Sequence, residues 1–207
     1  MELSYKTVAG EGTAEYVDRR SRFIGAVCPV TTEQQALSFI AAKKKEHWDA
    51  RHNVYAYVLR TEGISRFSDD SEPQGTAGLP VLEVLQKQGL TDCVVVVTRY
   101  FGGILLGTGG LVRAYSQSAA LAVQAAGVTE RRLCAFGTIV CDYAQYGWLQ
   151  SLIPECGGKL DNANFANDVT ISLHFPLECV DNFQKQLTDR SCGTLVFQKT
   201  EENYENF

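Results

Sequence analysis

The spacing of hydrophobic residues in the first two thirds of the chain predicts a mixed fold of strands and helices. Continuous or alternating apolar runs predict strands, and apolar residues three or four apart predict helices. The strands predicted in this part are residues 22–30, 53–59 and 92–98. The predicted helices are residues 31–48, 80–89 and 111–126. The polar stretch 68–78 and the glycine-rich stretch 102–110 are predicted loops.

The last third of the chain has a simpler pattern. The elements follow in the order strand, helix, strand, strand, helix, strand, over residues 135–142, 144–154, 157–165, 169–175, 180–187 and 194–199. This β-α-β-β-α-β order is typical of a ferredoxin-like sandwich. Strict alternation over 169–175 predicts one buried face and one exposed polar face that carries Thr170, Ser172 and His174. The polar tail, residues 201–207, is expected to fray.

Length and charge suggest how this α+β chain divides. Its 207 residues fit one large domain or two small ones. Residues 1–133 carry a net charge of +1 and residues 134–207 a net charge of −6, which together give the −5 of the whole chain. We therefore predict two domains, 1–133 and 134–207. The overall negative charge excludes a protein that coats nucleic acid by bulk electrostatics.

The cysteines and the absence of targeting patterns predict a cytoplasmic protein. The seven cysteines are odd in number, contain no C-x-x-C pair and mostly have apolar neighbours, which indicates reduced, buried thiols. No basic-then-apolar signal segment opens the chain, and the longest aliphatic run, residues 94–97, is too short to cross a bilayer. The three histidines do not have metal-ligand spacing, so neither a metal nor a cofactor is expected.

The glycine-rich loop is the first candidate site. A buried strand leads into this loop and a helix follows it, so the helix start offers unpaired N–H groups to an anion. The candidate anion- or partner-binding residues here are Arg99, Tyr100, Gly102, Gly103, Gly107, Gly109, Gly110 and Arg113. The loop does not complete either of two nucleotide-binding motifs. Thr108 stands where the Walker A motif needs lysine, and Val112 stands where the dinucleotide-binding motif needs its third glycine. A tight turn, close helix–sheet packing or a protein-binding surface would also use these glycines.

An acidic loop and a nearby histidine form the second candidate group. Asp69, Asp70, Glu72, Gly75, Thr76 and His52 belong to it. The three carboxylates could hold Mg²⁺ or move protons, and the alternative is a solvated turn that caps the helix at Pro80. His52 opens a strand and could be a general base, a phosphate contact or a structural residue. The basic clusters 19–22 and 43–45 could contact phosphates or form a solvated face.

Several of these stretches, in order, resemble one known family. Ser21-Arg22-Phe23-Ile24, Ala50-Arg51-His52-Asn53, the run from Asp69 to Gly78, and Arg99-Tyr100-Phe101-Gly102-Gly103 through Arg113-Ala114-Tyr115 are similar to the motifs of the IMPACT family, and over the whole chain to its bacterial YigZ-type members. The resemblance implies an N-terminal domain like ribosomal protein S5 domain 2 and a C-terminal ferredoxin-like domain similar to one in elongation factor G. The family loop has glycine where this chain has Ser71 and a small residue where it has Gln74. A left-handed backbone is therefore not expected at position 71.

The resemblance favours a non-enzymatic, translation-associated regulator that contacts RNA, the ribosome or a translation protein. Eukaryotic members regulate translation in the amino-acid-starvation kinase pathway by binding that kinase's activator, through a region not matched here. Because residues 134–207 are acidic, any RNA contact is expected on the first domain, through Arg99, Arg113 and the two basic clusters. The alternative is an enzyme acting on a phosphorylated or anionic small molecule held at the glycine-rich loop. A shared site requires the acidic and glycine-rich loops to face one another.

Overall fold

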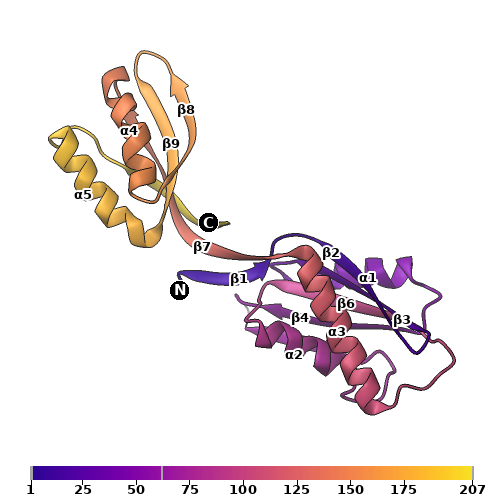
Figure 1. Cartoon of the computed structure of the whole chain (residues 1–207). Helices are drawn as coiled ribbons and strands as arrows, with labels where there is room; N and C mark the ends of the chain where they lie inside the picture. The colour runs from indigo at the N-terminus through magenta and orange to yellow at the C-terminus, as the bar shows by residue number, and fades with distance from the viewer. Residues whose placement is uncertain (1, 62, 207) are drawn as a thin grey trace. The chain divides into compact units, whose positions relative to one another are not determined.

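The structure, a computed structural model, describes residues 2–61 and 63–206. Its contacts divide the chain into two compact units, which we call the larger unit, Tyr5–Glu130, and the smaller unit, whose described residues are 2–4 and 131–206. Both units contain strands and helices (Figure 1). The elements are β1 (Ser4–Val8), β2 (Gly12–Asp18), β3 (Ser21–Pro29), α1 (Glu33–Glu46), β4 (His52–Leu59), β5 (Ile64–Ser68), α2 (Gly78–Lys87), β6 (Cys93–Tyr100), α3 (Thr108–Ala126), β7 (Val128–Cys141), α4 (Tyr143–Glu155), β8 (Lys159–Phe165), β9 (Val169–Pro176), a 3₁₀ turn (Leu177–Cys179), α5 (Val180–Ser191) and β10 (Gln198–Asn206).

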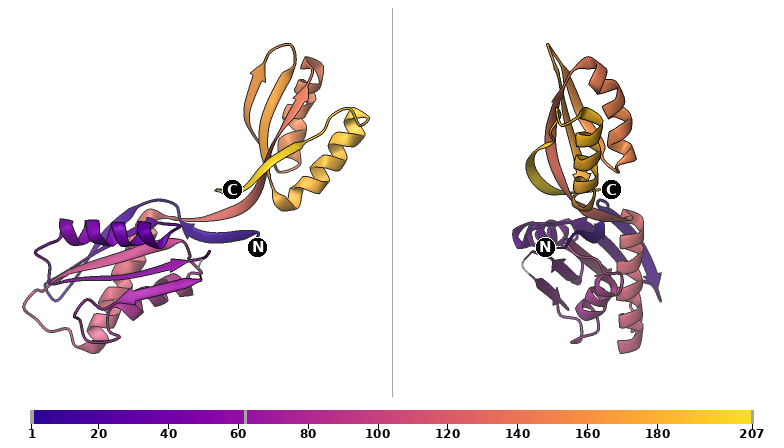
Figure 2. Two further views of the ribbon diagram at one scale, coloured as in Figure 1. Left: turned by 180° about the vertical axis from the view of Figure 1, so that it is seen from behind. Right: turned by 90° about the vertical axis from the view of Figure 1, so that its left-hand side faces the viewer.

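The larger unit is an antiparallel sheet covered by helices on both faces. Its strand order is β2-β3-β6-β4-β5. Val94 and Val96 of β6 pack with α1 on one face, whereas Val95 and Val97 belong to the core beneath α2 and α3 on the other. Because β6 is buried on both faces, its sequence is a continuous aliphatic run. The helices on opposite faces can be followed in Figures 1 and 2.

Local signals in the sequence set one end of each of two helices. The Thr32 side chain accepts a hydrogen bond from the Gln35 backbone N–H at the start of α1 (3.3 Å), while the Gln35 side chain accepts one from Thr31. A threonine followed three residues later by glutamine is a common N-terminal cap. Gly127, with φ of 72°, ends α3, where a left-handed residue favours glycine.

The smaller unit has the predicted element order, and its strands lie in the order β10-β7-β9-β8. Ile171 and Leu173 of β9 pack with Leu149 of α4 and Phe183 of α5, so both helices share this unit's core. Thr170 and Ser172 lie on the opposite face, as the alternation predicts, but they are half-buried rather than exposed.

Two expectations for this unit are wrong. His174 is only 7% exposed, because its ring stacks on Phe136 with the ring centroids 4.9 Å apart and its Nδ1 lies 2.7 Å from Asp161 Oδ1. The tail does not fray, because its described part, residues 201–206, continues β10 along β7. Strand pairing with a distant segment overrides the polar composition of the tail.

Candidate functional site

Asp69 organises the acidic loop. Its Oδ2 accepts a hydrogen bond from the Gly75 N–H (2.9 Å), and its Oδ1 accepts from the N–H groups of Ala77 (3.1 Å) and Gly78 (2.8 Å). Gly78 is the first residue of α2. This carboxylate therefore ties the loop to the start of α2, which is the capping role considered as one alternative.

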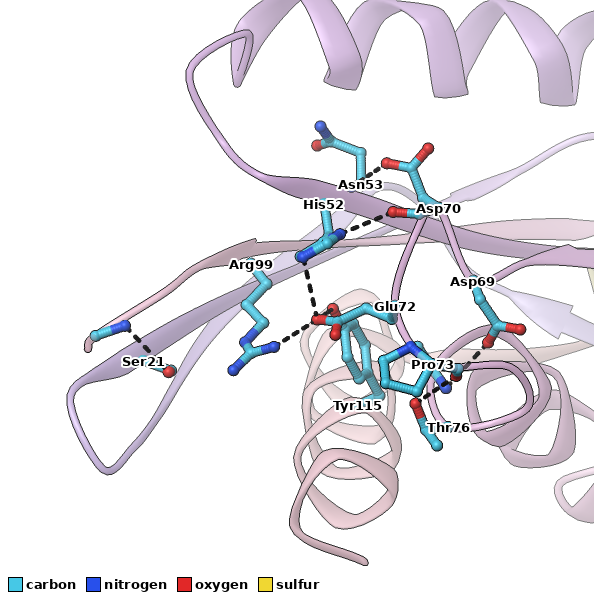
Figure 3. Close-up of polar contacts among 12 residues, drawn as sticks. Ser21, His52, Asn53, Asp69, Asp70, Glu72, Pro73, Thr76, Arg99 and Tyr115 are labelled. Atoms are coloured by element: carbon cyan, nitrogen blue, oxygen red, sulfur yellow. Dashed lines mark hydrogen bonds and ion pairs between the residues drawn. The ribbon is translucent and has the colours of Figure 1, made fainter. Parts of the chain in front are cut away.

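Asp70 joins the acidic loop to β4 and α1 rather than facing a ligand. Its Oδ2 accepts from the Asn53 N–H (2.6 Å) and its Oδ1 pairs with Lys44 Nζ (2.9 Å). The Asp70 carbonyl accepts from His52 Nδ1 (2.8 Å), as Figure 3 shows. That bond fixes the orientation of the His52 ring and leaves its Nε2 toward Glu72.

The backbone at position 71 corrects the expectation drawn from the missing glycine. Ser71 has φ of 71° and Asp70 has φ of 43°, so two consecutive residues are left-handed. Non-glycine residues rarely adopt this region. The loop adopts this left-handed backbone without a glycine, because the hydrogen bonds of Asp69 and Asp70 constrain it on both sides.

Glu72 is the buried centre of the site. Its side chain is 4% exposed, and Oε1 accepts from Arg99 Nη1 (2.6 Å) and from the Tyr115 hydroxyl (2.8 Å). His52 Nε2 lies 3.8 Å from the same oxygen. Burial, and then the neighbouring Glu72 carboxylate, raise the pKa of Tyr115 far above its usual range, so this hydroxyl remains a donor. Glu72 is thus not part of a solvated turn.

Tyr115 is a site residue that sequence reasoning missed. It lies two turns into α3, within the motif that carries the family resemblance, but nothing in the pattern separated it from other buried residues of that helix. The signal would have been a fully buried tyrosine, whose hydroxyl needs a partner.

Strand pairing places Arg99 in the middle of the site. On β6 it lies opposite Phe23 of β3 and His52 of β4. Its guanidinium carbon lies 5.5 Å from the ring centroids of both Phe23 and Phe101, and its side chain is 6% exposed. Among the described residues, none accepts a hydrogen bond from its buried Nε. Arg99 is therefore a buried cation with donor capacity left over, not a surface cation.

A pocket of about 250 Å³ joins the two loops. Glu72 and Pro73 line it from the acidic loop, and Gly107 and Thr108 from the end of the glycine-rich loop. Arg99 lines it as well, together with Leu105, Leu106 and Leu111. The acidic and glycine-rich loops therefore do face one another.

The glycines of the second loop have different roles. Gly103 (φ 84°) and Gly107 (φ 72°) need a left-handed backbone. Gly102 packs against the backbone of Arg20 and Ser21, where a Cβ would collide, and its N–H donates to Ser21 Oγ (3.2 Å). Gly109 faces open space, and Gly110 contacts Leu106. Close packing against the Arg20 turn therefore explains the glycine at position 102. Only residues 105–108 of the loop line the pocket.

The remaining candidates lie outside the pocket. Arg113 is exposed and lines a separate pocket of about 580 Å³ with Pro80, Val84 and other residues of α2 and α3. The Tyr100 hydroxyl donates to Asp49 Oδ1 (3.0 Å) and lies 3.1 Å from His47 Nδ1. The Thr76 hydroxyl donates to the Pro73 carbonyl (2.7 Å) and Gly75 turns the loop at φ of 74°.

Exposed cations and an exposed tryptophan gather at the same end of the sheet. We call this surface the basic edge; it consists of Arg19, Arg20, Lys45, Trp48 and Arg51. Arg19 and Arg20 form the turn between β2 and β3 that contacts Gly102, two residues beyond Tyr100. Tyr100 in turn contacts His47, at the end of α1 next to Trp48.

The basic edge combines Arg51 and Trp48 with the cations of the two basic clusters that are left after internal pairing. Arg22 pairs with Glu15, Lys43 with Glu46 and Lys44 with Asp70. In the part of the chain that the structure describes, the four cations of the basic edge form no ion pair. Trp48 is 83% exposed.

Each carboxylate of the acidic loop has a different set of partners, and within residues 2–61 and 63–206 no three His, Cys, Asp or Glu side chains are placed to hold a metal ion. Across the same residues, no helix is long and apolar enough to cross a membrane.

The fold and site define an α+β protein of two units, in which the acidic and glycine-rich loops of the larger unit meet at one pocket. Known proteins share its sequence pattern. Residues 19–123 match the Impact N-terminal domain, and residues 139–194 match a domain of unknown function, DUF1949. The chain belongs to the IMPACT family.

Its relatives include bacterial and mammalian proteins. IMPACT family member YvyE of Bacillus subtilis is 39% identical over 97% of this chain and 93% of its own length. IMPACT family member YigZ of Escherichia coli is 36% identical over 89% of this chain and 92% of its own. Protein IMPACT of Rattus norvegicus is 37% identical over 45% of this chain and 31% of its own. A solved structure titled as a hypothetical protein matches with a TM-score of 0.62, at 33% identity, over 98% of this chain and all of that chain.

Proposed function

We propose that this protein is a non-enzymatic, translation-associated binding protein that contacts single-stranded RNA through the basic edge of its larger unit. One observation carries the proposal: Trp48 is 83% exposed and lies at the same end of the sheet as four cations that pair with no acid among the described residues. Proteins that bind single strands combine cations that follow the backbone with aromatic rings on which bases stack. Trp48 supplies the ring, and the four cations supply the charge.

The charge distribution supports placing RNA on the larger unit. Residues 134–207 carry a net charge of −6, which repels phosphates, and the cations of the basic edge all lie within residues 19–51. Arg99 and Arg113 do not belong to this contact, because Arg99 is buried against Glu72 and Arg113 lies with α2 and α3.

The strand order and the cysteines support the translation-associated role and the cytoplasmic location that we propose. The strand order β10-β7-β9-β8 favours the ferredoxin-like assignment for the smaller unit, and we keep ribosomal protein S5 domain 2 as the proposed likeness of the larger one. The seven cysteines carry free thiols, which suits a cytoplasmic protein near the ribosome.

Fluorescence tests the proposal directly, because each unit has one tryptophan. In a Trp148→Phe variant, Trp48 is the only tryptophan and reports on the basic edge. Titration with single-stranded RNA is expected to quench its emission as bases stack. Four phosphate contacts predict a log–log slope of affinity against salt of about −3, at about −0.7 per contact for single strands.

A matched pair of charge variants locates the contact. Arg19→Gln with Arg20→Gln is expected to flatten the salt slope by about 1.4. The control, Lys87→Gln with Arg113→Gln, removes two exposed cations from the other face of the same unit and should leave the slope unchanged. Equal losses in both variants, or no quenching at low salt, would refute RNA binding at the basic edge.

A further inference from the structure

The pocket between the two loops has features that the basic edge does not use. It encloses about 250 Å³, its leucines and Pro73 make one wall apolar, and Arg99, Glu72 and Thr108 are its polar part. The volume is enough for a small anionic group and part of what carries it, but not for a whole drug-sized ligand.

Helix α3 points unpaired donors at this pocket. It is 19 residues long, begins at Thr108, and follows Gly107, which offers no side-chain acceptor as N-cap. Leu111 makes the first intrahelical hydrogen bond, to the Gly107 carbonyl (3.0 Å). In the described structure the N–H groups of Thr108, Gly109 and Gly110 have no acceptor. Such a helix start attracts anions through both its donors and its dipole.

Arg99 gives a second, independent indication of a ligand. Its side chain is 94% buried and lines the pocket, and among the hydrogen bonds of the described residues only Nη1 has an acceptor, so Nη2 has donors left for a ligand. A buried donor without a partner costs free energy, so such groups usually have one in the functional complex.

We infer that this pocket binds a phosphate monoester, held by the first turn of α3, the Thr108 hydroxyl and Arg99. The inference rests on the proposed function to the extent that the phosphate is the 5′ end of an RNA; a free nucleotide monophosphate offers the same chemistry. The glycine-rich loop connects the two surfaces, since Gly102 contacts the Arg20 turn and Gly107 lines the pocket. A terminal phosphate in the pocket would place the following nucleotides toward the basic edge.

Glu72 sets the strength of this site. Its carboxylate lies 2.6 Å from Arg99 Nη1, so the charges of the two side chains offset each other and the helix donors provide the attraction. Glu72→Gln keeps an oxygen that can accept from Arg99 and Tyr115 while removing the negative charge. This variant is therefore expected to bind phosphate more tightly than the unmodified protein.

The experiment compares one RNA sequence with a 5′-phosphate, a 5′-hydroxyl or a 3′-phosphate at constant ionic strength. The 5′-phosphate form is expected to bind about tenfold more tightly than the 5′-hydroxyl form, the effect of one or two charge-assisted hydrogen bonds. Thr108→Pro should abolish this preference, because it removes an N–H and a hydroxyl. Proline is favoured at the first helical position, so folding should be retained. Thr108→Ala, which keeps the N–H, should retain part of the preference.

The outcomes separate the two proposals. RNA binding without a 5′-phosphate preference, or with a preference that Thr108→Pro leaves intact, overturns the phosphate site alone. If adenosine 5′-monophosphate binds in a Thr108→Pro-sensitive manner while no RNA does, the phosphate site is supported and the proposed function fails. A rise in phosphate affinity for Glu72→Gln supports the site, and a fall contradicts it.

Discussion

At the scale of single residues, the site is organised around one buried carboxylate. An isolated buried charge is strongly unfavourable, and Glu72 is tolerated because Arg99 supplies the opposite charge and Tyr115 a further donor. The ring of Phe23 packs edge-on against Tyr115, with centroids 5.2 Å apart, so the tyrosine also has a packing role.

Tyr115→Phe separates these two roles. The ring contact with Phe23 is kept, but Glu72 loses a neutral donor that stays protonated because the pKa of Tyr115 is raised. We expect the free energy of unfolding to fall by about 2 kcal/mol, measured by urea denaturation. RNA affinity at the basic edge should not change, because Tyr115 is fully buried. Unchanged stability would mean that this hydrogen bond contributes nothing to the fold.

At the scale of elements, the β2–β3 turn breaks a local rule. Asp18 pairs with Ser21, so Arg19 and Arg20 alone form the turn, and both have positive φ, 44° and 67°. Turns of this kind favour Asn-Gly, and left-handed backbone costs other residues about 1 kcal/mol or more each. Local rules are broken most often at functional sites.

The turn therefore predicts a trade-off between stability and binding. Arg19→Asn with Arg20→Gly is expected to raise the free energy of unfolding by about 2 kcal/mol while weakening RNA binding. Urea denaturation and the Trp48 fluorescence titration measure the two effects on the same sample. A variant that is more stable but binds RNA equally well would show that the arginines have no role in binding.

The sequence pattern was sufficient for elements that bury many side chains. The aliphatic strand β6 and the end of α3 at Ala126 were both predicted, because each has a local physical cause. The edge strands β2 and β5 and the outer part of β10 were not predicted. Almost none of their side chains is buried, so hydrophobic burial gives little signal in the sequence, and pairing with a neighbouring strand decides their structure.

The site was predictable in its composition but not in its geometry. The two loops were identified, yet the sequence could not show that Glu72 of one meets Arg99 beside the other. That contact depends on the register that aligns His52, Arg99 and Phe23 across three strands. Likewise, pairing of Arg22, Lys43 and Lys44 with acids decides which cations remain available.

At the scale of the whole molecule, the two units have separate hydrophobic cores. The core of the larger unit is formed by residues between Val8 and Val123, and that of the smaller unit by residues between Ala135 and Phe197. Each unit has one tryptophan, Trp48 and Trp148. Trp148 packs against the core of the smaller unit, whereas Trp48 is exposed. The emission of each tryptophan therefore reports a different event: unfolding of the smaller unit, or binding at the basic edge.

Phe183→Ala tests whether stability and RNA binding are divided between the units. Phe183 is fully buried and stacks on Phe175 with centroids 4.1 Å apart, so truncation should cost the smaller unit about 3–5 kcal/mol. In a Trp48→Phe background, the urea midpoint read from Trp148 should fall steeply. In a Trp148→Phe background, RNA quenching of Trp48 should keep its affinity and its salt slope, because no cation of the basic edge belongs to the smaller unit. A parallel loss of RNA affinity would show that the acidic unit takes part in binding, and the assignment of RNA to the larger unit alone would then be wrong.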